Sequence, residues 1–182
     1  MNTSKLPVSG AGQAPVSKPY SDPKFVTLAQ LAELPFFEGL GQVRLSQLIP
    51  HTKTSYFDAG QSILTEGELA NRFYVIVSGR VAIEHQIDGQ AVRVQEIGPG
   101  EAVGFSWLFT PDKLHFTARA IEPVKAIFFY GTLLREDCEL EPGLGYELLL
   151  RAGQVMVKRM EAVIDLLKHR EREANQDPSP LI

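Results

Sequence analysis

The chain is poor in the residues that build covalent or metal-linked frameworks. It has one cysteine, Cys138, among 182 residues, so an intrachain disulfide and a cysteine-rich metal site are both excluded. No apolar run approaches the ~18–20 residues of a membrane-spanning helix, and the N-terminus lacks the apolar core of a secretory signal. We therefore expect a cytoplasmic protein that does not associate with membranes.

Histidine is also scarce, and its spacing does not suit a metal. The chain has His51, His85, His115 and His169, and no two of them stand two or four residues apart, as paired ligands on a strand or helix do. A Gly-x-Ser-x-Gly nucleophile elbow is absent, and the acidic neighbours of Cys138 disfavour its thiolate. We predict no metal site and no catalytic residue, and therefore a protein that is not an enzyme.

Charge of one sign does not dominate the sequence. Charged residues make up 22% of the chain and the net charge is −4. This balance argues against a surface that binds nucleic acid over the whole chain. The 44% of hydrophobic residues is ordinary for a globular domain, so the fold class has to come from the pattern.

The pattern changes twice along the chain. Segment 1–24 holds four prolines among small and polar residues, which predicts a disordered tail. Helical stripes follow at 25–34 and 40–49, and a proline stops each of them. From Thr52 the apolar residues alternate in short runs, and Asp88-Gly89 between two such runs is typical of a tight hairpin. Short strands with turns every ~8–12 residues predict a sandwich or jelly roll.

The stretch 98–120 is the one around which we expect the chain to be organised. It opens on the turn sequence Gly98-Pro99-Gly100 and passes through Gly104, where a backbone without a Cβ atom can be approached closely by a ligand. A short helical run at 106–109, a polar loop and a strand at 116–120 follow. A glycine turn before a helical turn presents backbone N–H groups to an anion.

Residues 31–170 resemble the cyclic-nucleotide-binding domain of the Crp/Fnr-type regulators. The resemblance is carried by the entry helix and turn at 34–40, the strands at 63–68 and 73–81, and the turn at 98–101 before the phosphate-binding cassette. It implies an α+β fold over residues 25–143, namely an eight-stranded antiparallel jelly-roll barrel with short N-terminal helices and a long C-terminal helix.

The resemblance also implies a ligand site in the cassette. The candidate ligand-binding residues are Gly104, Phe105, Ser106, Trp107, Lys113, His115, Phe116 and Thr117. In this interpretation backbone amides bind the phosphate of cAMP, cGMP or cyclic di-GMP. Lys113 supplies charge, His115 and the hydroxyl groups add hydrogen bonds, and Phe105 or Phe116 stacks on a base.

Two cassette positions depart from the family's pattern. Phe105 stands where the family has a glutamate that holds the ribose, and Leu114 or His115 stands where it has the arginine that pairs with the phosphate. A buried phosphate without a cation is costly. The alternative interpretation is therefore a ligand-free interaction scaffold, in which Phe105 and Trp107 fill the cavity themselves.

The longest helical pattern covers residues 144–174. Its apolar positions Leu149, Met156, Met160, Val163 and Leu167 step by seven, four, three and four, which is typical of a coiled-coil seam. A helix of ~30 residues spans ~45 Å, longer than a small barrel, so we predict that it joins two copies into a homodimer. Its basic residues, Lys158 and Arg159 among them, alternate with acidic ones and are interpreted as a solvated face.

The short segment at the end of the chain affects which partners we predict. Residues 175–182 hold Pro178 and Pro180 and form a predicted tail. The segment after Leu167 is too short for the roughly three-helix DNA-reading head of a Crp/Fnr regulator. We predict a non-enzymatic signalling module that binds no DNA directly and relays the ligand through its C-terminal helix to a protein partner.

Overall fold

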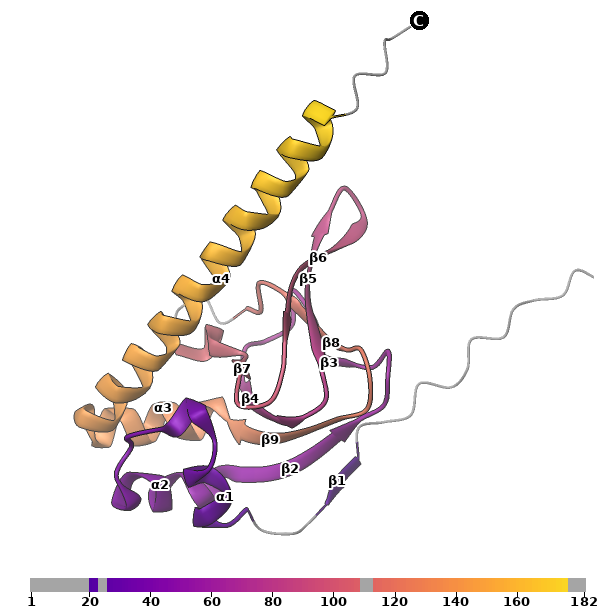
Figure 1. Cartoon of the computed structure of the whole chain (residues 1–182). Coiled ribbons are helices and arrows are strands. Elements are labelled where there is room, and N and C mark those ends of the chain that lie inside the picture. The colour runs from indigo at the N-terminus through magenta and orange to yellow at the C-terminus, as the bar shows by residue number, and fades with distance from the viewer. Residues whose placement is uncertain (1–19, 23–25, 109–112, 177–182) are drawn as a thin grey trace, which may run out of the picture.

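The protein is an open sandwich of two sheets with helices on one side (Figure 1). The computed structural model describes residues 20–22, 26–108 and 113–176. Within these residues nine strands form two sheets, one with the order β1-β2-β9-β4-β7 and the other with the order β3-β8-β5-β6. All pairings inside the two sheets are antiparallel.

The elements follow the predicted order of short helices, strands and a long helix. The strands are β1 (Tyr20–Asp22), β2 (Thr52–Phe57), β3 (Ser62–Leu64), β4 (Arg72–Ser78), β5 (Val81–Ile87), β6 (Gln90–Ile97), β7 (Ala102–Val103), β8 (Thr117–Ala120) and β9 (Val124–Tyr130). The helices are α1 (Leu28–Ala32), α2 (Gln42–Leu48), α3 (Gly131–Leu140) and α4 (Pro142–Gln176), with short 3-10 turns η1 (Pro35–Phe37), η2 (Ile49–His51) and η3 (Phe105–Leu108).

The sheets do not close into the predicted eight-stranded barrel. The antiparallel layers and the long C-terminal helix are confirmed, but no ladder among the described residues joins β7 to β6 or β1 to β3. One reason is that β7 has only two residues, because the chain turns away at Gly104. The opening at this edge is where α4 runs across the sheets.

The two ends of the fold differ from the predicted boundaries. Residues 20–22, predicted as part of the tail 1–24, form β1 and pair with β2 from Tyr20↔Tyr56 to Asp22↔Thr54. The rest of that predicted tail and residues 177–182 of the C-terminal one lie outside the described residues. Helix α4 begins at Pro142, two residues before its predicted start, because a proline suits the first helical position.

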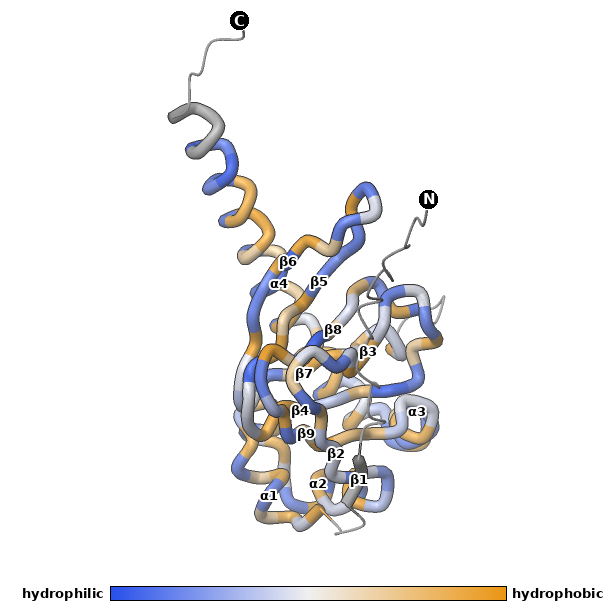
Figure 2. Tube along the Cα trace, turned by 90° about the vertical axis from the view of Figure 1, so that its right-hand side faces the viewer, coloured by the Kyte–Doolittle hydropathy of each residue, from blue (hydrophilic) through white to orange (hydrophobic). Residues whose placement is uncertain are grey.

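The Asp88-Gly89 turn is the tight hairpin that the sequence predicts. Ile87 pairs with Gln90 across it, and both turn residues have positive φ angles, 50° at Asp88 and 77° at Gly89. Positive φ at both central positions is the geometry that matches the twist of the strands. The hairpin projects from the sheets toward the same side as the free part of α4 (Figures 1 and 2).

Both faces of the five-stranded sheet are buried, and this arrangement positions α4. On β4, Phe73 and Val75 belong to the core beneath the helices, whereas Tyr74 and Ile76 belong to the core between the sheets. The first turns of α4 join the helix-side core, where Leu144 and Leu148 are buried. The helix then leaves the sandwich, and apolar residues continue along it (Figure 2).

Two kinds of feature are absent from the described part of the chain. None of its helices is long and apolar enough to cross a membrane. None of its His, Cys, Asp and Glu side chains gather in groups of three that can hold a metal ion.

Candidate functional site

Gly104 sets the shape of the cassette, residues 98–120. Its φ angle is +91°, and a Cβ atom built on it would lie 2.3 Å from the carbonyl oxygen of Arg72. Neither the backbone conformation nor the space admits another residue. The chain therefore passes from β7 into η3 through a turn that only glycine allows.

Phe105, the first residue of η3, belongs to an aromatic cluster. Its ring centroid lies 5.1 Å from that of Phe73 and 5.6 Å from that of Phe36, distances typical of favourable aromatic pairs. The side chain is 4% exposed. It forms a wall between the helix-side core and the space on the other side of the cassette.

That space is a cavity of about 270 Å³ between the cassette, the four-stranded sheet and α4. Most of its lining is apolar. The cassette contributes Val103, Gly104, Phe105, Ser106, Leu114, His115, Phe116 and Ala118, the sheets contribute Leu64, Ile83, Val94 and Gln95, and α4 contributes Met156, Arg159, Met160 and Val163.

Arg159 brings a positive charge from α4 to the cavity wall. Its Nη2 atom donates a hydrogen bond of 2.7 Å to the carbonyl oxygen of Ala102 in β7. Its guanidinium carbon lies 5.8 Å from the ring centroid of Phe105, within the range of a cation–π contact. The helix is therefore tied to the cassette at the position where the cassette begins its turn.

The guanidinium of Arg159 stays charged although it is buried. Burial lowers its pKa to about 10, and the charge of Glu101 acts in the opposite direction. A pKa near 10 leaves the side chain cationic at neutral pH. Its Nε atom is buried and has no hydrogen-bond partner in the described structure, and the same holds for Oε1 of Gln95. Such unpaired polar atoms are rare in native interiors.

Five of the eight predicted ligand-binding residues line this cavity. They are Gly104, Phe105, Ser106, His115 and Phe116. Phe116 is 37% exposed, and its ring also packs against His85 of β5, with centroids 5.6 Å apart. These five residues form much of the cassette face of the cavity, and their role in ligand binding stays a prediction.

The other three predicted residues lie elsewhere. Trp107 is 2% exposed and packs in the helix-side core against Gly131. Lys113 is exposed and forms an isolated backbone bridge with Leu69. Thr117 is buried, and its Oγ1 atom accepts a hydrogen bond of 3.1 Å from the backbone N–H of Glu66. The predicted charge at Lys113 is therefore not part of the cavity wall, and residues 109–112 lie outside the described ones.

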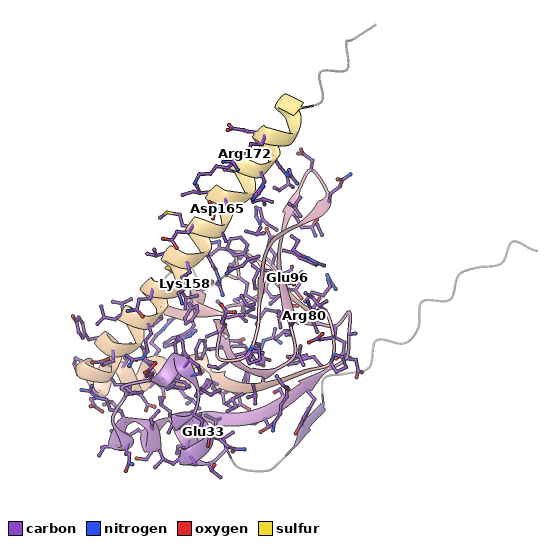
Figure 3. The ribbon with its side chains drawn as sticks, in the orientation of Figure 1. Glu33, Arg80, Glu96, Lys158, Asp165 and Arg172 are labelled. Atoms are coloured by element: carbon purple, nitrogen blue, oxygen red, sulfur yellow. The ribbon has the colours of Figure 1, made fainter. Side chains whose placement is uncertain are left out.

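Arg159 is the site residue that sequence reasoning missed. It was interpreted as part of a solvated face because acidic and basic residues alternate around it. The available indication was its spacing, three residues after Met156 and four before Val163, which places it on the side of the helix that these residues share. The neighbouring Lys158 is exposed on α4 (Figure 3).

The predicted seam of α4 divides between two faces. Met156, Met160 and Val163 line the cavity, and Leu149 lies in a separate hollow beside Trp107. Leu149 and Met156 are also exposed to solvent, and the other exposed apolar residues of the helix form a neighbouring stripe with steps of four and three. This stripe consists of Tyr146, Leu150, Gly153, Val157, Met160, Ile164 and Leu167, whose side chains other than Gly153 are 42–62% exposed. Met160 belongs to both faces.

A second, larger hollow of about 490 Å³ lies along α4 next to η1 and the turn at 98–101. Charges of both signs border it. Arg151 donates hydrogen bonds to Glu147 and, at 2.7 Å, to the carbonyl oxygen of Glu38. Lys158 and Glu101 also lie on this hollow. Its charged groups are mixed, so it favours no single class of ligand.

Cys138 lines the separate hollow beside Trp107 and is not poised for reaction. Burial, with the charges of Asp137 and Glu139, raises the pKa of its thiol to about 11. The thiol is therefore protonated at neutral pH, and a protonated thiol is neither a nucleophile nor a metal ligand.

Comparison with known proteins assigns the central part of the chain to a described domain. Residues 54–138 match the model of the family described as "Cyclic nucleotide-binding domain". Among curated proteins, the chain is 27% identical over 131 residues to the CRP-like cAMP-activated global transcriptional regulator of Mycobacterium tuberculosis. That match covers 71% of this chain and 57% of the regulator, so the chain spans little more than half of its relative's length.

Solved structures share the fold. A putative cyclic nucleotide-binding protein from Geobacter metallireducens superimposes with a TM-score of 0.67 at 24% identity, covering 74% of this chain and 98% of the other. The regulatory subunit of a cAMP-independent protein kinase A from Trypanosoma brucei does so with a TM-score of 0.58 at 25% identity, covering 68% and 44%.

Proposed function

Because residues 54–138 match the model of the cyclic nucleotide-binding domain and the chain is similar to a CRP-like regulator, we propose that this chain binds a cyclic nucleotide in the cavity between the cassette and α4. The observation that supports the proposal is that one cavity wall belongs to α4. In this proposal the chain is a non-enzymatic, cytoplasmic regulatory module. Binding favours one position of α4 over another, which requires that the ligand has a different affinity for the two positions.

The size of the cavity favours a cyclic mononucleotide. Its 270 Å³ lies just below the ~300–1,000 Å³ that ligand pockets commonly enclose. cAMP and cGMP carry one base, one sugar and one phosphate, whereas cyclic di-GMP carries two of each. We therefore expect cAMP or cGMP to bind and cyclic di-GMP to be too large for this cavity.

A thermal-shift and calorimetric titration of the chain with cAMP, cGMP and cyclic di-GMP tests the proposal. A ligand that binds only the folded state adds about 2.7 kcal/mol of stability at a hundred times its dissociation constant. We expect a rise in Tm and measurable heat with a cyclic mononucleotide. A chain that shows neither with any of the three ligands is not a sensor of cyclic nucleotides.

The alternative function is a ligand-free interaction scaffold. The cassette supports it. Phe105 is buried at the position where the family has a ribose-binding glutamate, and Leu114 is buried at or next to the position where the family has its arginine. The name of the trypanosomal relative describes it as cAMP-independent. The titration above separates the two functions, because a scaffold keeps its stability unchanged in the presence of every ligand.

We further propose that α4 joins two copies of the chain and contacts a protein partner, with no direct binding to DNA. The exposed apolar stripe of α4 supports this, because an apolar seam with steps of four and three is the surface that a second helix covers. It runs through Gly153, which has no side chain and allows a close approach of two helices.

A further inference from the structure

The cassette wall of the cavity has little charge of its own. Among the cassette residues that line the cavity, Ser106 and His115 are polar, and the rest are apolar or glycine. Neither Lys113 nor Arg119, the two cationic residues of this part of the cassette, lines the cavity. An anionic ligand therefore has to find its positive partner on another element.

Arg159 of α4 is that partner by position and by unused capacity. Its guanidinium has five N–H donors, and the hydrogen bond recorded for it within the described structure goes to the carbonyl of Ala102. The Nε atom is buried without a partner. A planar guanidinium suits phosphate and carboxylate groups, which can accept two of its N–H donors at once.

Gln95 of β6 adds the complementary unused acceptor. Its side chain lines the same cavity as Arg159, and its Oε1 atom is buried without a hydrogen-bond donor. Both residues lie where β6 meets α4, and their two unpaired atoms are buried within the cavity wall itself. Around them the lining consists of aliphatic and aromatic side chains that suit a ring system.

We propose that Arg159 and Gln95 anchor the ligand of this cavity, with Arg159 pairing with a single anionic group and Gln95 accepting a hydrogen bond from an N–H or O–H group. The inference rests on the proposed function and deepens it. It selects a monoanion with a ring body, a description that a cyclic mononucleotide fits. It also places the main anchor on the helix instead of on the cassette.

This placement gives the ligand a competitor inside the protein. Without ligand, the guanidinium donates to the carbonyl of Ala102 in β7. With an anion present, the donors of Arg159 turn toward the anion, because hydrogen bonds between charged groups are stronger than those to a neutral carbonyl. The position of α4 then depends directly on the occupancy of the cavity.

The test compares a charged ligand with its neutral counterpart in matched variants. The full chain is titrated with cAMP and adenosine, and with cGMP and guanosine, as wild type, Arg159→Gln and Lys158→Gln. Lys158→Gln removes the same charge from the adjacent exposed position. We expect the wild type and Lys158→Gln to prefer the cyclic nucleotide over the nucleoside by ~10-fold or more, as charged hydrogen bonds allow. We expect Arg159→Gln to lose this preference.

Two further variants make the assignment specific. Arg159→Lys keeps the charge without the planar fork, so its preference should lie between those of the wild type and Arg159→Gln. Gln95→Leu should weaken the nucleotide and the nucleoside by a similar factor, about 5-fold, and leave their ratio unchanged. An Arg159→Gln protein that is folded by circular dichroism and keeps the full preference overturns the role of Arg159, and unchanged binding in Gln95→Leu overturns that of Gln95.

A probe that is not a nucleotide separates this inference from the proposed function. Anilinonaphthalene sulfonate is an aromatic monoanion that fluoresces in apolar cavities. If the wild type binds no cyclic nucleotide, the proposed function fails. The anchor role of Arg159 still stands if Arg159→Gln binds this probe at least ~5-fold more weakly than Lys158→Gln. Equal binding of the probe by the two variants overturns it.

Discussion

At the scale of single residues, the cassette depends on Gly104 and the cavity depends on Arg159. The first is required by backbone geometry, because its φ angle is +91° and the carbonyl of Arg72 occupies the place of a side chain. The second is a charge in a largely apolar setting, which is costly unless it is paired. Buried charges of this kind are common at functional sites.

Substitution of Gly104 by alanine should destabilise the chain by about 3 kcal/mol or more. The strain of a positive φ angle contributes about 1–3 kcal/mol, and the clash with the backbone of β4 adds to it. Urea unfolding measures the loss. Gly60→Ala is the control, because Gly60 has a φ angle of +85° with open space around its Cβ position. Equal losses in the two variants would show that the close approach to Arg72 does not matter.

At the scale of elements, α4 has two apolar faces. One face carries Met156, Arg159 and Val163 toward the cavity, and the neighbouring face carries the exposed apolar stripe. A helix that is apolar over both faces has no unique seam in its sequence. This is why the spacing alone groups residues from the two faces into one predicted seam, and that seam stays a prediction.

The exposed stripe makes a prediction about assembly. Ile164→Glu should convert a dimer into a monomer, because it places a charge within an apolar seam, and Ile164 does not line the cavity. Light scattering after gel filtration measures the mass. His169→Glu is the control, since His169 is exposed on α4 outside the stripe. A wild type that runs as a monomer at every concentration refutes the helix interface.

The sequence predicted the elements better than their closure. Asp88-Gly89, the proline-ended helices and the alternating strands depend on local rules, and each is present. The closed barrel depended on how distant edges meet, and no local pattern encodes the gap between β7 and β6. The wall that α4 adds to the cavity also depends on contacts between distant parts of the chain. Arg159 becomes a site residue only because β7 and Phe105 lie beneath it in the folded chain.

At the scale of the whole molecule, the sandwich supports one end of a long helix and leaves the other end free. Leu144 and Leu148 fix the first turns of α4 in the core, whereas Asp165 and Arg172 lie further along its free part (Figure 3). A movement of the middle of α4 is therefore passed on to its free end. The hairpin β5–β6, which projects toward the same side, is the other element that a partner of this region can contact.

If both proposals hold, ligand affinity should depend on the concentration of the protein. A ligand that favours one position of α4 also favours the dimer built on that position, and the coupling is reciprocal. We expect the apparent Kd for the cyclic nucleotide to change several-fold between dilute and concentrated wild-type protein, when it is measured by fluorescence titration. In Ile164→Glu the Kd should be the same at both concentrations. A concentration-independent Kd in a dimeric wild type would show that the two surfaces are uncoupled.

Met160 gives this dependence a further meaning. The same side chain borders the cavity and stands in the exposed stripe. The proposed ligand site and the proposed dimer interface therefore share a residue. Dilution of the protein then weakens ligand binding, because it dissociates the dimer that the ligand favours. In a cell, the threshold of the response follows the abundance of the protein itself, and a change in its expression retunes the sensor without any change in the concentration of the ligand.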